Sequence, residues 1–171
     1  MRLLEAGSLR IHEFFGENVP QYAILSHTWG DEEVTFSDVV HEQYKHKTGF
    51  NKMRYCSEQA TKDGLQYIWM DTCCIDKSSS AELPEAINSM FRWYRDAVAC
   101  YVYLSDVAKQ PDDYQWVSVA QSQIRGHEPL EESWKVQFRN AKWFTRGWTL
   151  QELIAPKSVL FFPPRMESAW K

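Results

Sequence analysis

Apolar runs and helix-like periods alternate along this chain. Four of the runs are short and continuous, a pattern that favours strands buried on both faces: YAILSH (22–27), LQYIWM (65–70), ACYVYLSD (99–106) and SVLFF (158–162). A weaker alternation in LRIHEFF (9–15) predicts a short edge strand.

The segment between the first two runs predicts an amphipathic helix over residues 50–63. Phe50, Met53 and Ala60 recur there at helical spacing. Gly64 follows directly and is a suitable residue for the end of a helix, because it adopts the left-handed conformation without strain.

The strongest helical pattern covers residues 83–98. Pro84 fits its first turn, and one face carries the apolar side chains Leu83, Ile87, Met90, Phe91, Tyr94 and Val98. Two further helices are predicted over residues 133–144 and 146–156, and Pro156 ends the second of them.

Three stretches do not follow this alternation of apolar runs and helical patterns. Residues 34–46 fit either a short helix or a loop. Residues 107–131 are rich in Pro, Asp, Gln, Ser and Gly, and predict a long loop or insertion that carries at most a helical turn. Residues 163–171 are expected to form a tail or the start of a continuation.

Strands that alternate with helices indicate an α/β fold, with a parallel sheet covered by helices on both faces. The length of 171 residues fits a single domain over residues 1–171. Ligands bind such sheets at the carboxyl ends of the strands. Polar tips that follow three of the strands are therefore expected at one edge: SHTWGDEE (26–33), DTCCID (71–76) and SDVAKQ (105–110).

The composition of the chain argues against several classes of function. The net charge is -4 and the basic residues are scattered, so no nucleic-acid partner is expected. No apolar run approaches the roughly 20 residues of a membrane span, and no signal-peptide pattern is present, which predicts a cytoplasmic protein. The four cysteines form no CxxC pair and are expected as free thiols. Eight tryptophans suggest a contact surface or a pocket for a planar ring.

Side chains with chemical capability gather in the first two tips and in RGWTLQEL (146–153). The candidates for a shared pocket are Ser26, His27, Trp29, Gly30, Asp71, Arg146, Trp148 and Glu152. Trp148 and Glu152 are four residues apart and would share one helix face. An indole beside a carboxylate partly removes it from water, which raises the carboxylate's pKa and strengthens its hydrogen bonds to a ligand.

Purely structural interpretations exist for the same residues. Glu152 could be an exposed helix residue or an ion-pair partner of Arg146. Trp29 and Trp148 could belong to the core. From spacing alone, neither these interpretations nor a catalytic role for Glu152 is excluded.

The first two tips leave further alternatives open. His27 could serve only as a structural hydrogen-bonding residue, and Asp71 and Asp76 could cap a loop and the next helix. His27 could also form a nucleophilic pair with Cys73 or Cys74. The ligand spacing of a zinc site is absent, so no metal is expected. The chain contains no GxGxxG, GxxxxGK(S/T) or HExxH motif.

Three stretches resemble the motif blocks of the fungal heterokaryon-incompatibility (HET) domain, in the family's order and rough spacing. They lie at about 22–36 (YAILSHTWGDEEVTF), 68–104 (beginning IWMDTCCIDK) and 143–156 (WFTRGWTLQELIAP). The resemblance implies a role in recognition of non-self after hyphal fusion and in the cell death that follows. Lys77 stands where the family often has Gln. Members are usually longer, so this chain is expected to be a fragment or a stand-alone member.

HET domains are held to be distant relatives of TIR domains, and WTLQEL is similar to the TIR helix that carries the catalytic glutamate of NAD cleavage. The resemblance therefore implies a TIR-like (flavodoxin-like) fold and a catalytic role for Glu152. NAD would be the substrate, with no cofactor. The other implied roles are ring stacking by Trp29 or Trp148, pocket lining by Ser26, His27, Gly30 and Asp71, and contact with the pyrophosphate by Arg146.

Two hypotheses of function follow from this resemblance. In the first, the chain is an NAD glycohydrolase that cleaves the nicotinamide–ribose bond and thereby kills the cell. In the second, it is a non-catalytic death-signalling module that acts by self-association or by recruiting a partner. The expected partners are NAD or a related nucleotide, further copies of the same domain, and a regulatory domain or partner protein.

Overall fold

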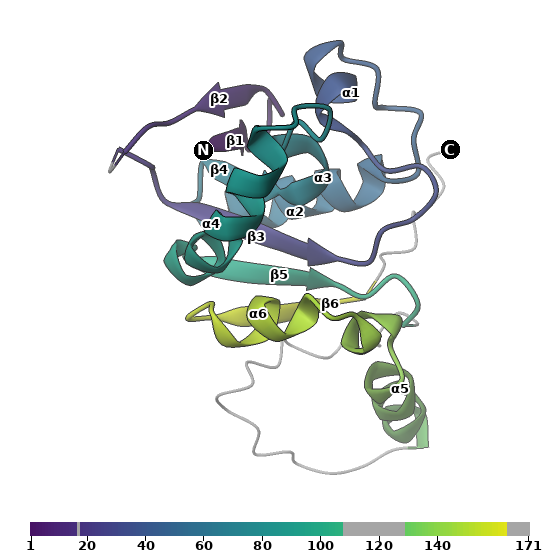
Figure 1. The fold of residues 1–171 in the computed structure, drawn as a ribbon. Helices are drawn as coiled ribbons and strands as arrows, with labels where there is room; N and C mark the ends of the chain where they lie inside the picture. The colour runs from purple at the N-terminus through teal and green to yellow at the C-terminus, as the bar shows by residue number, and fades with distance from the viewer. Residues whose placement is uncertain (17, 108–128, 164–171) are drawn as a thin grey trace.

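A six-stranded sheet with helices on both faces organises the computed structural model, which describes residues 1–16, 18–107 and 129–163 (Figure 1). Most of the predicted insertion and nearly all of the predicted tail lie outside these residues. The strand order is β2-β1-β4-β3-β5-β6. The strands are β1 (Arg2–Glu5), β2 (Ile11–Glu13), β3 (Tyr22–His27), β4 (Tyr67–Met70), β5 (Ala99–Tyr103) and β6 (Val159–Phe162).

The four predicted buried strands are confirmed as β3, β4, β5 and β6, which run parallel. The sheet as a whole is mixed, however, and the prediction of a wholly parallel sheet is wrong. The unpredicted β1 pairs antiparallel with both β4 and β2, and Leu4 lies opposite Ile68 and Ile11. Four residues with no alternation gave no strand signal, although Leu3 and Leu4 are fully buried.

The helices are α1 (Phe36–Val40), α2 (Phe50–Lys62), α3 (Asp71–Cys74), α4 (Glu82–Asp96), α5 (Pro129–Arg139), the 3₁₀ helix η2 (Lys142–Thr145) and α6 (Thr149–Ile154). Helices α4 and α6 lie on one face of the sheet, and α2 lies on the other (Figure 1). The ambiguous stretch 34–46 contains α1, whose start is stabilised by a reciprocal capping box between Thr35 and Asp38.

Helix α2 ends as its sequence predicts. Gly64 adopts φ +76, and its N–H donates to the carbonyl of Thr61. The N–H of Leu65 reaches back to the carbonyl of Ala60 at 2.8 Å. These two bonds form a Schellman motif, which satisfies carbonyls that the helix leaves free and turns the chain into β4.

The predicted helix over 133–144 is wrong in its bounds and its continuity. Helix α5 begins at Pro129, inside the stretch expected to be irregular, and ends at Arg139. Ala141 then takes an extended conformation (φ -58, ψ 133), and the 3₁₀ turn that follows buries Trp143 completely. The break lets the chain change direction toward the core.

The last helix also begins later than predicted, at Thr149 instead of residue 146. Arg146 has an extended backbone (ψ 141), and Trp148 occupies the N-cap position, where its side chain makes no capping hydrogen bond. The predicted apolar face of α4 is only partly correct. Met90 and Tyr94 are buried, whereas Ile87, Phe91 and Val98 are exposed.

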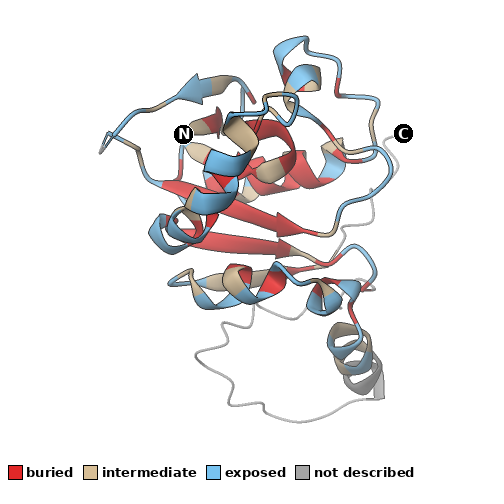
Figure 2. Cartoon of the chain, viewed as in Figure 1, coloured by how far each residue is buried: buried red, intermediate tan, exposed pale blue. Residues whose placement is uncertain are grey.

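The core lies where the parallel strands meet α2 and α4 (Figure 2). All six residues of β3 are buried, because the strand is central in the sheet and covered on both faces. Trp69 of β4 packs against the rings of Trp93 and Tyr94 of α4, with centroids 5.5 and 6.0 Å apart. This packing fixes the carboxyl ends of β3 and β4 relative to α4.

Candidate functional site

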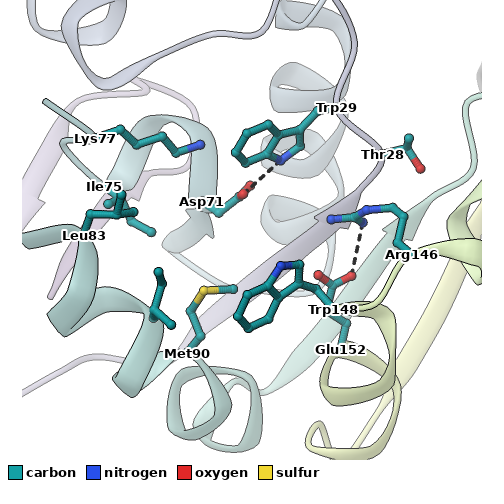
Figure 3. A pocket seen from close by; sticks show the side chains of 11 residues that line it. Thr28, Trp29, Asp71, Ile75, Lys77, Leu83, Met90, Arg146, Trp148 and Glu152 are labelled. Atoms are coloured by element: carbon teal, nitrogen blue, oxygen red, sulfur yellow. Dashed lines mark hydrogen bonds and ion pairs between the residues drawn. The ribbon is translucent and has the colours of Figure 1, made fainter.

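A pocket of about 460 Å³ lies beyond the carboxyl ends of β3 and β4, beside α4 and α6 (Figure 3). In open α/β sheets, ligands bind beyond the carboxyl ends of the strands, and this pocket has that position. Four segments supply its lining: Thr28 and Trp29 after β3; Asp71, Ile75 and Lys77 after β4; Leu83, Ile87 and Met90 from α4; and Arg146, Trp148 and Glu152 around the start of α6.

Ser26 and His27 end β3 and point to opposite faces of the sheet, as successive strand residues do. Ser26 meets Glu152 and Trp143 on one side, and His27 meets Lys52 of α2 on the other. Both side chains are buried and both are hydrogen-bonded, which buried polar groups require. The strand end thus connects two polar clusters.

The first cluster holds the Glu152 carboxylate. Glu152 is only 3% exposed. The Ser26 hydroxyl donates to its Oε2 at 2.6 Å, and the Trp143 indole donates to the Ser26 oxygen at 2.6 Å. Arg146 Nη1 lies 3.4 Å from the same Oε2 and donates to the His27 carbonyl at 2.7 Å. These contacts hold one edge of the carboxylate in place.

The other carboxylate oxygen is available to a ligand. Both hydrogen bonds to Glu152 end on Oε2, and Oε1 receives none from the described part of the chain. Burial raises the pKa of Glu152, while the hydrogen bond from Ser26 and the charge of Arg146 act in the opposite direction. The result is a pocket carboxylate with a raised pKa and one free oxygen.

The second cluster holds Asp71, and both of its oxygens are engaged. Oδ1 lies 3.0 Å from His27 Nε2, and Oδ2 accepts the Trp29 indole N–H at 2.9 Å. Burial alone would raise the pKa of Asp71, but the hydrogen bond from His27 and the charge of Lys77 outweigh it and lower this pKa. Asp71 is therefore an ionised anchor for two rings.

His27 is held from behind by Lys52. The Lys52 ammonium lies 2.9 Å from His27 Nδ1, donates to the Thr28 carbonyl at 3.0 Å and forms an ion pair with Glu33. Three acceptors match the three N–H donors of an ammonium. Accordingly Nδ1 of His27 accepts, which assigns the imidazole proton to Nε2, where it donates to Asp71.

Two tryptophans form the aromatic part of the pocket. Trp29 is 53% exposed and Trp148 is 50% exposed, so the alternative that they are core residues is wrong. The Lys77 ammonium lies 3.5 Å from the centroid of the Trp29 ring. Such exposed indoles, one fixed by its hydrogen bond to Asp71, present flat surfaces to a planar ligand.

The structure brings five of the eight candidates to the pocket: Trp29, Asp71, Arg146, Trp148 and Glu152. Ser26 and His27 lie behind the lining and position it. Gly30 does not line the pocket; its N–H donates to Glu33. The SDVAKQ tip is not part of this lining, and within its described residues Asp106 accepts the backbone N–H of Lys142 instead.

Three charged residues of the site were absent from the candidates: Lys77, Lys52 and Glu33. Lys77 directly follows the DTCCID tip, so its position in that motif was an available signal. Lys52 lies within the helical pattern of α2, and Glu33 ends the first tip. The sequence pattern does not mark Lys52 or Glu33 as site residues, because their ion pair depends on how α2 packs on β3.

The structure does not support a nucleophilic pair of His27 with Cys73 or Cys74. All four cysteines are free and buried. Burial raises the pKa of Cys56, Cys73 and Cys100, and both ring nitrogens of His27 are occupied by Asp71 and Lys52. In the described ranges, no group of three or more His, Cys, Asp or Glu side chains is arranged to hold a metal.

Comparison with known proteins places this architecture in a family. The sequence model of the family "Heterokaryon incompatibility protein (HET)" matches residues 22–152, and the chain belongs to this family. It is 52% identical over 168 residues to the vegetative incompatibility protein HET-E-1 of Podospora anserina, a match that covers 95% of this chain and 11% of that protein. No solved structure is significantly similar to the chain. Within the described residues, no helix has the length and apolar character needed to cross a membrane.

Proposed function

We propose that this domain is a cell-death effector of fungal non-self recognition and that it cleaves NAD at the bond between nicotinamide and ribose. The observation that carries the proposal is the Glu152 carboxylate, buried in a pocket, with Oε2 held by Ser26 and with Oε1 accepting no hydrogen bond from the described residues. The incompatibility role is supported by membership of the HET family and by the similarity to HET-E-1. That similarity covers a small part of HET-E-1, so the role of a whole protein is part of the proposal.

The chemistry suits a single carboxylate. Nicotinamide in NAD is a cationic pyridinium, so it departs with the electron pair of the C–N bond as a neutral molecule and no metal is needed. The sugar passes through a state that resembles an oxocarbenium ion. The free Oε1 of Glu152 would hold the ribose hydroxyls and stabilise the positive charge. Water then adds to the sugar carbon and releases a proton, which yields ADP-ribose.

The environment of Glu152 fits this role. Burial raises its pKa, so the ionised form is costly in the empty pocket. A cationic pyridinium beside it would favour ionisation and thus be bound at the reacting centre. The apolar side chains of Leu83, Ile87 and Met90 line the α4 side of the pocket and would limit the access of water.

The TIR-like fold also stays a proposal, supported by strand order. The parallel strands lie in the order β4-β3-β5-β6. Counted from β3 this order is 2-1-3-4, which is the beginning of the flavodoxin-like order 2-1-3-4-5. The free cysteines fit a reducing cytoplasm as the place of action.

A second candidate function is death signalling by self-association or partner recruitment without catalysis. Exposed apolar side chains on two helices that contact each other favour it: Ile87 and Phe91 on α4, with Leu150 and Ile154 on α6. Exposed apolar patches mark interaction surfaces. The two functions are compatible if assembly of several copies is required for NAD cleavage.

The test is release of nicotinamide from NAD by the purified chain, in dilute solution and when clustered on a multivalent support. Wild type should turn over NAD, at least when clustered, and Glu152→Gln should not. If clustered wild-type protein releases no nicotinamide, the enzymatic proposal fails. In that case self-association measured by sedimentation, and its loss on substitution of Phe91 by Ser, would favour the second candidate.

A further inference from the structure

The pocket has two cations in its lining, Arg146 and Lys77, and they differ in how they are engaged. Arg146 donates to the His27 carbonyl and faces Glu152 Oε2. Lys77 makes no hydrogen bond or ion pair with the residues that the structure describes. Its ammonium instead lies over the Trp29 ring, 3.5 Å from the centroid. Lys77 is therefore the cation that is available to an anion.

The nearby carboxylate of Asp71 acts on Lys77 through its charge but makes no hydrogen bond or ion pair with it. Asp71 accepts the Trp29 indole on Oδ2 and contacts His27 through Oδ1. The same hydrogen bond orients the Trp29 ring on which Lys77 rests. Lys77 thus has a defined place at the pocket wall, and moving from there to an anion would break only an exposed cation–π contact.

We propose that Lys77 binds the phosphates of the nucleotide in this pocket, and that Arg146 is a positioning residue for Glu152. This inference rests on the proposed function, and it gives Lys77 the role that was expected for Arg146 from the sequence. Lys77 and Glu152 lie on opposite sides of the pocket (Figure 3). The ligand is thereby oriented, with its phosphates toward Trp29 and its nicotinamide-bearing ribose toward Glu152.

The chemistry of lysine fits this task. An ammonium on a four-carbon stem is a mobile point charge, and it binds phosphate without the planar geometry that arginine needs. Burial lowers the pKa of Lys77, and the charge of Asp71 opposes this effect. An arriving phosphate would add a second negative charge beside the ammonium and hold it protonated.

The experiment measures binding of ADP-ribose, ADP and adenosine to the purified chain by calorimetry, together with NAD turnover. Three variants are compared with wild type. Lys77→Met removes the charge and keeps the stem, and Lys77→Arg keeps the charge. Lys62→Met is the matched control, because Lys62 is an exposed lysine in the last turn of α2 and is not part of the pocket lining.

We expect Lys77→Met to weaken ADP and ADP-ribose binding about 10-fold or more, because a charge-assisted contact is lost. Adenosine has no phosphate, so its binding should not change. Lys77→Arg should recover most of the affinity, and Lys62→Met should resemble wild type. In NAD turnover, Lys77→Met should raise KM and leave kcat nearly unchanged, unlike a change at Glu152.

The outcomes separate this inference from the proposed function. If ADP binds equally well to wild type, Lys77→Met and Lys62→Met, or does not bind to wild type at all, the inference is overturned. If NAD is cleaved but Lys77→Met leaves KM unchanged, the inference fails while the proposed function stands. If ADP binding depends on Lys77 and clustered protein cleaves no NAD, the phosphate site stands and the proposed function fails.

Discussion

Asp71 and Glu152 are two carboxylates of one pocket, and their surroundings give them opposite properties. Asp71 has both oxygens engaged, by His27 and Trp29, and its pKa is lowered. Glu152 has one oxygen engaged, by Ser26 and Arg146, and its pKa is raised. Burial raises the pKa of both, so the hydrogen bonds and the nearby charges decide the difference. The charge of Lys77 helps to lower the pKa of Asp71, whereas the charge of Asp71 adds to the rise at Glu152.

This contrast assigns different tasks to the two groups. Asp71 holds two rings, because one of its oxygens contacts His27 and the other accepts the indole N–H of Trp29. A carboxylate with a free oxygen and a raised pKa has capacity to interact with a ligand. Substitution of each carboxylate and of its partners tests whether the two groups have separate tasks.

The largest expected effect is on catalysis. Glu152→Gln should lower the kcat for nicotinamide release about 100-fold or more, as expected when a group that stabilises the transition state is removed. Asp71→Asn should lower kcat much less, because Asp71 acts through Trp29. The measurement is nicotinamide release by clustered protein. Equal losses in both variants would mean that the two carboxylates do not have separate tasks.

The next largest effect is on stability, and here the Asp71 variant is expected to lose more than the Glu152 variant. Asp71→Asn should lower the free energy of unfolding by about 1–3 kcal/mol, because an amide nitrogen would then face one of the N–H donors of His27 and Trp29. Glu152→Gln should cost less, since the buried charge disappears while the amide oxygen still accepts from Ser26. Urea unfolding followed by circular dichroism measures both. A larger loss in Glu152→Gln would contradict the assignment.

Stability should also depend on pH with opposite signs. The raised pKa of Glu152 means that the folded state holds this proton longer, so its contribution is present below the ordinary glutamate pKa and is lost as pH rises through the folded pKa. The lowered pKa of Asp71 contributes stability above the ordinary aspartate pKa, which is lost as pH falls through the folded pKa.

The variants isolate these two contributions. In thermal melts from acid to neutral pH, Glu152→Gln should remove the loss of stability on rising pH, and Asp71→Asn should remove part of the loss in acid. If Glu152→Gln leaves the pH profile of unfolding identical to that of wild type, its pKa is not raised in the folded state.

The smallest effect is expected from Trp29→Phe, which keeps a ring but removes the indole donor to Asp71. Since Trp29 is half exposed, the cost should be about 0.5 kcal/mol, the low end for a hydrogen bond. The pKa of Asp71 should rise, because this bond lowers it. NMR titration of the Asp71 side chain checks this, and an unchanged pKa would mean that His27 alone holds the carboxylate.

Local sequence was sufficient for much of the fold. The runs that became β3, β4, β5 and β6, and the helix that ends at Gly64, were predictable because apolar periodicity and glycine conformation act over a few residues. The same holds for Trp29 and Asp71 as members of one pocket, since parallel strands bring their carboxyl ends to one edge. Glu152 lies on the helix before β6, so this rule does not reach it, and its place in the pocket was expected from the resemblance of its motif.

Tertiary structure decided the rest. The place of β1 between β2 and β4, the late start of α6, and the pairing of Lys52 with His27 depend on contacts between residues far apart in the chain. So does the difference between the carboxylates. The sequence by itself determined which ionisable groups are present and near which strand ends. Their pKa values and free oxygens depend on burial and on distant donors such as Ser26 and His27, which only the folded chain brings within hydrogen-bond distance.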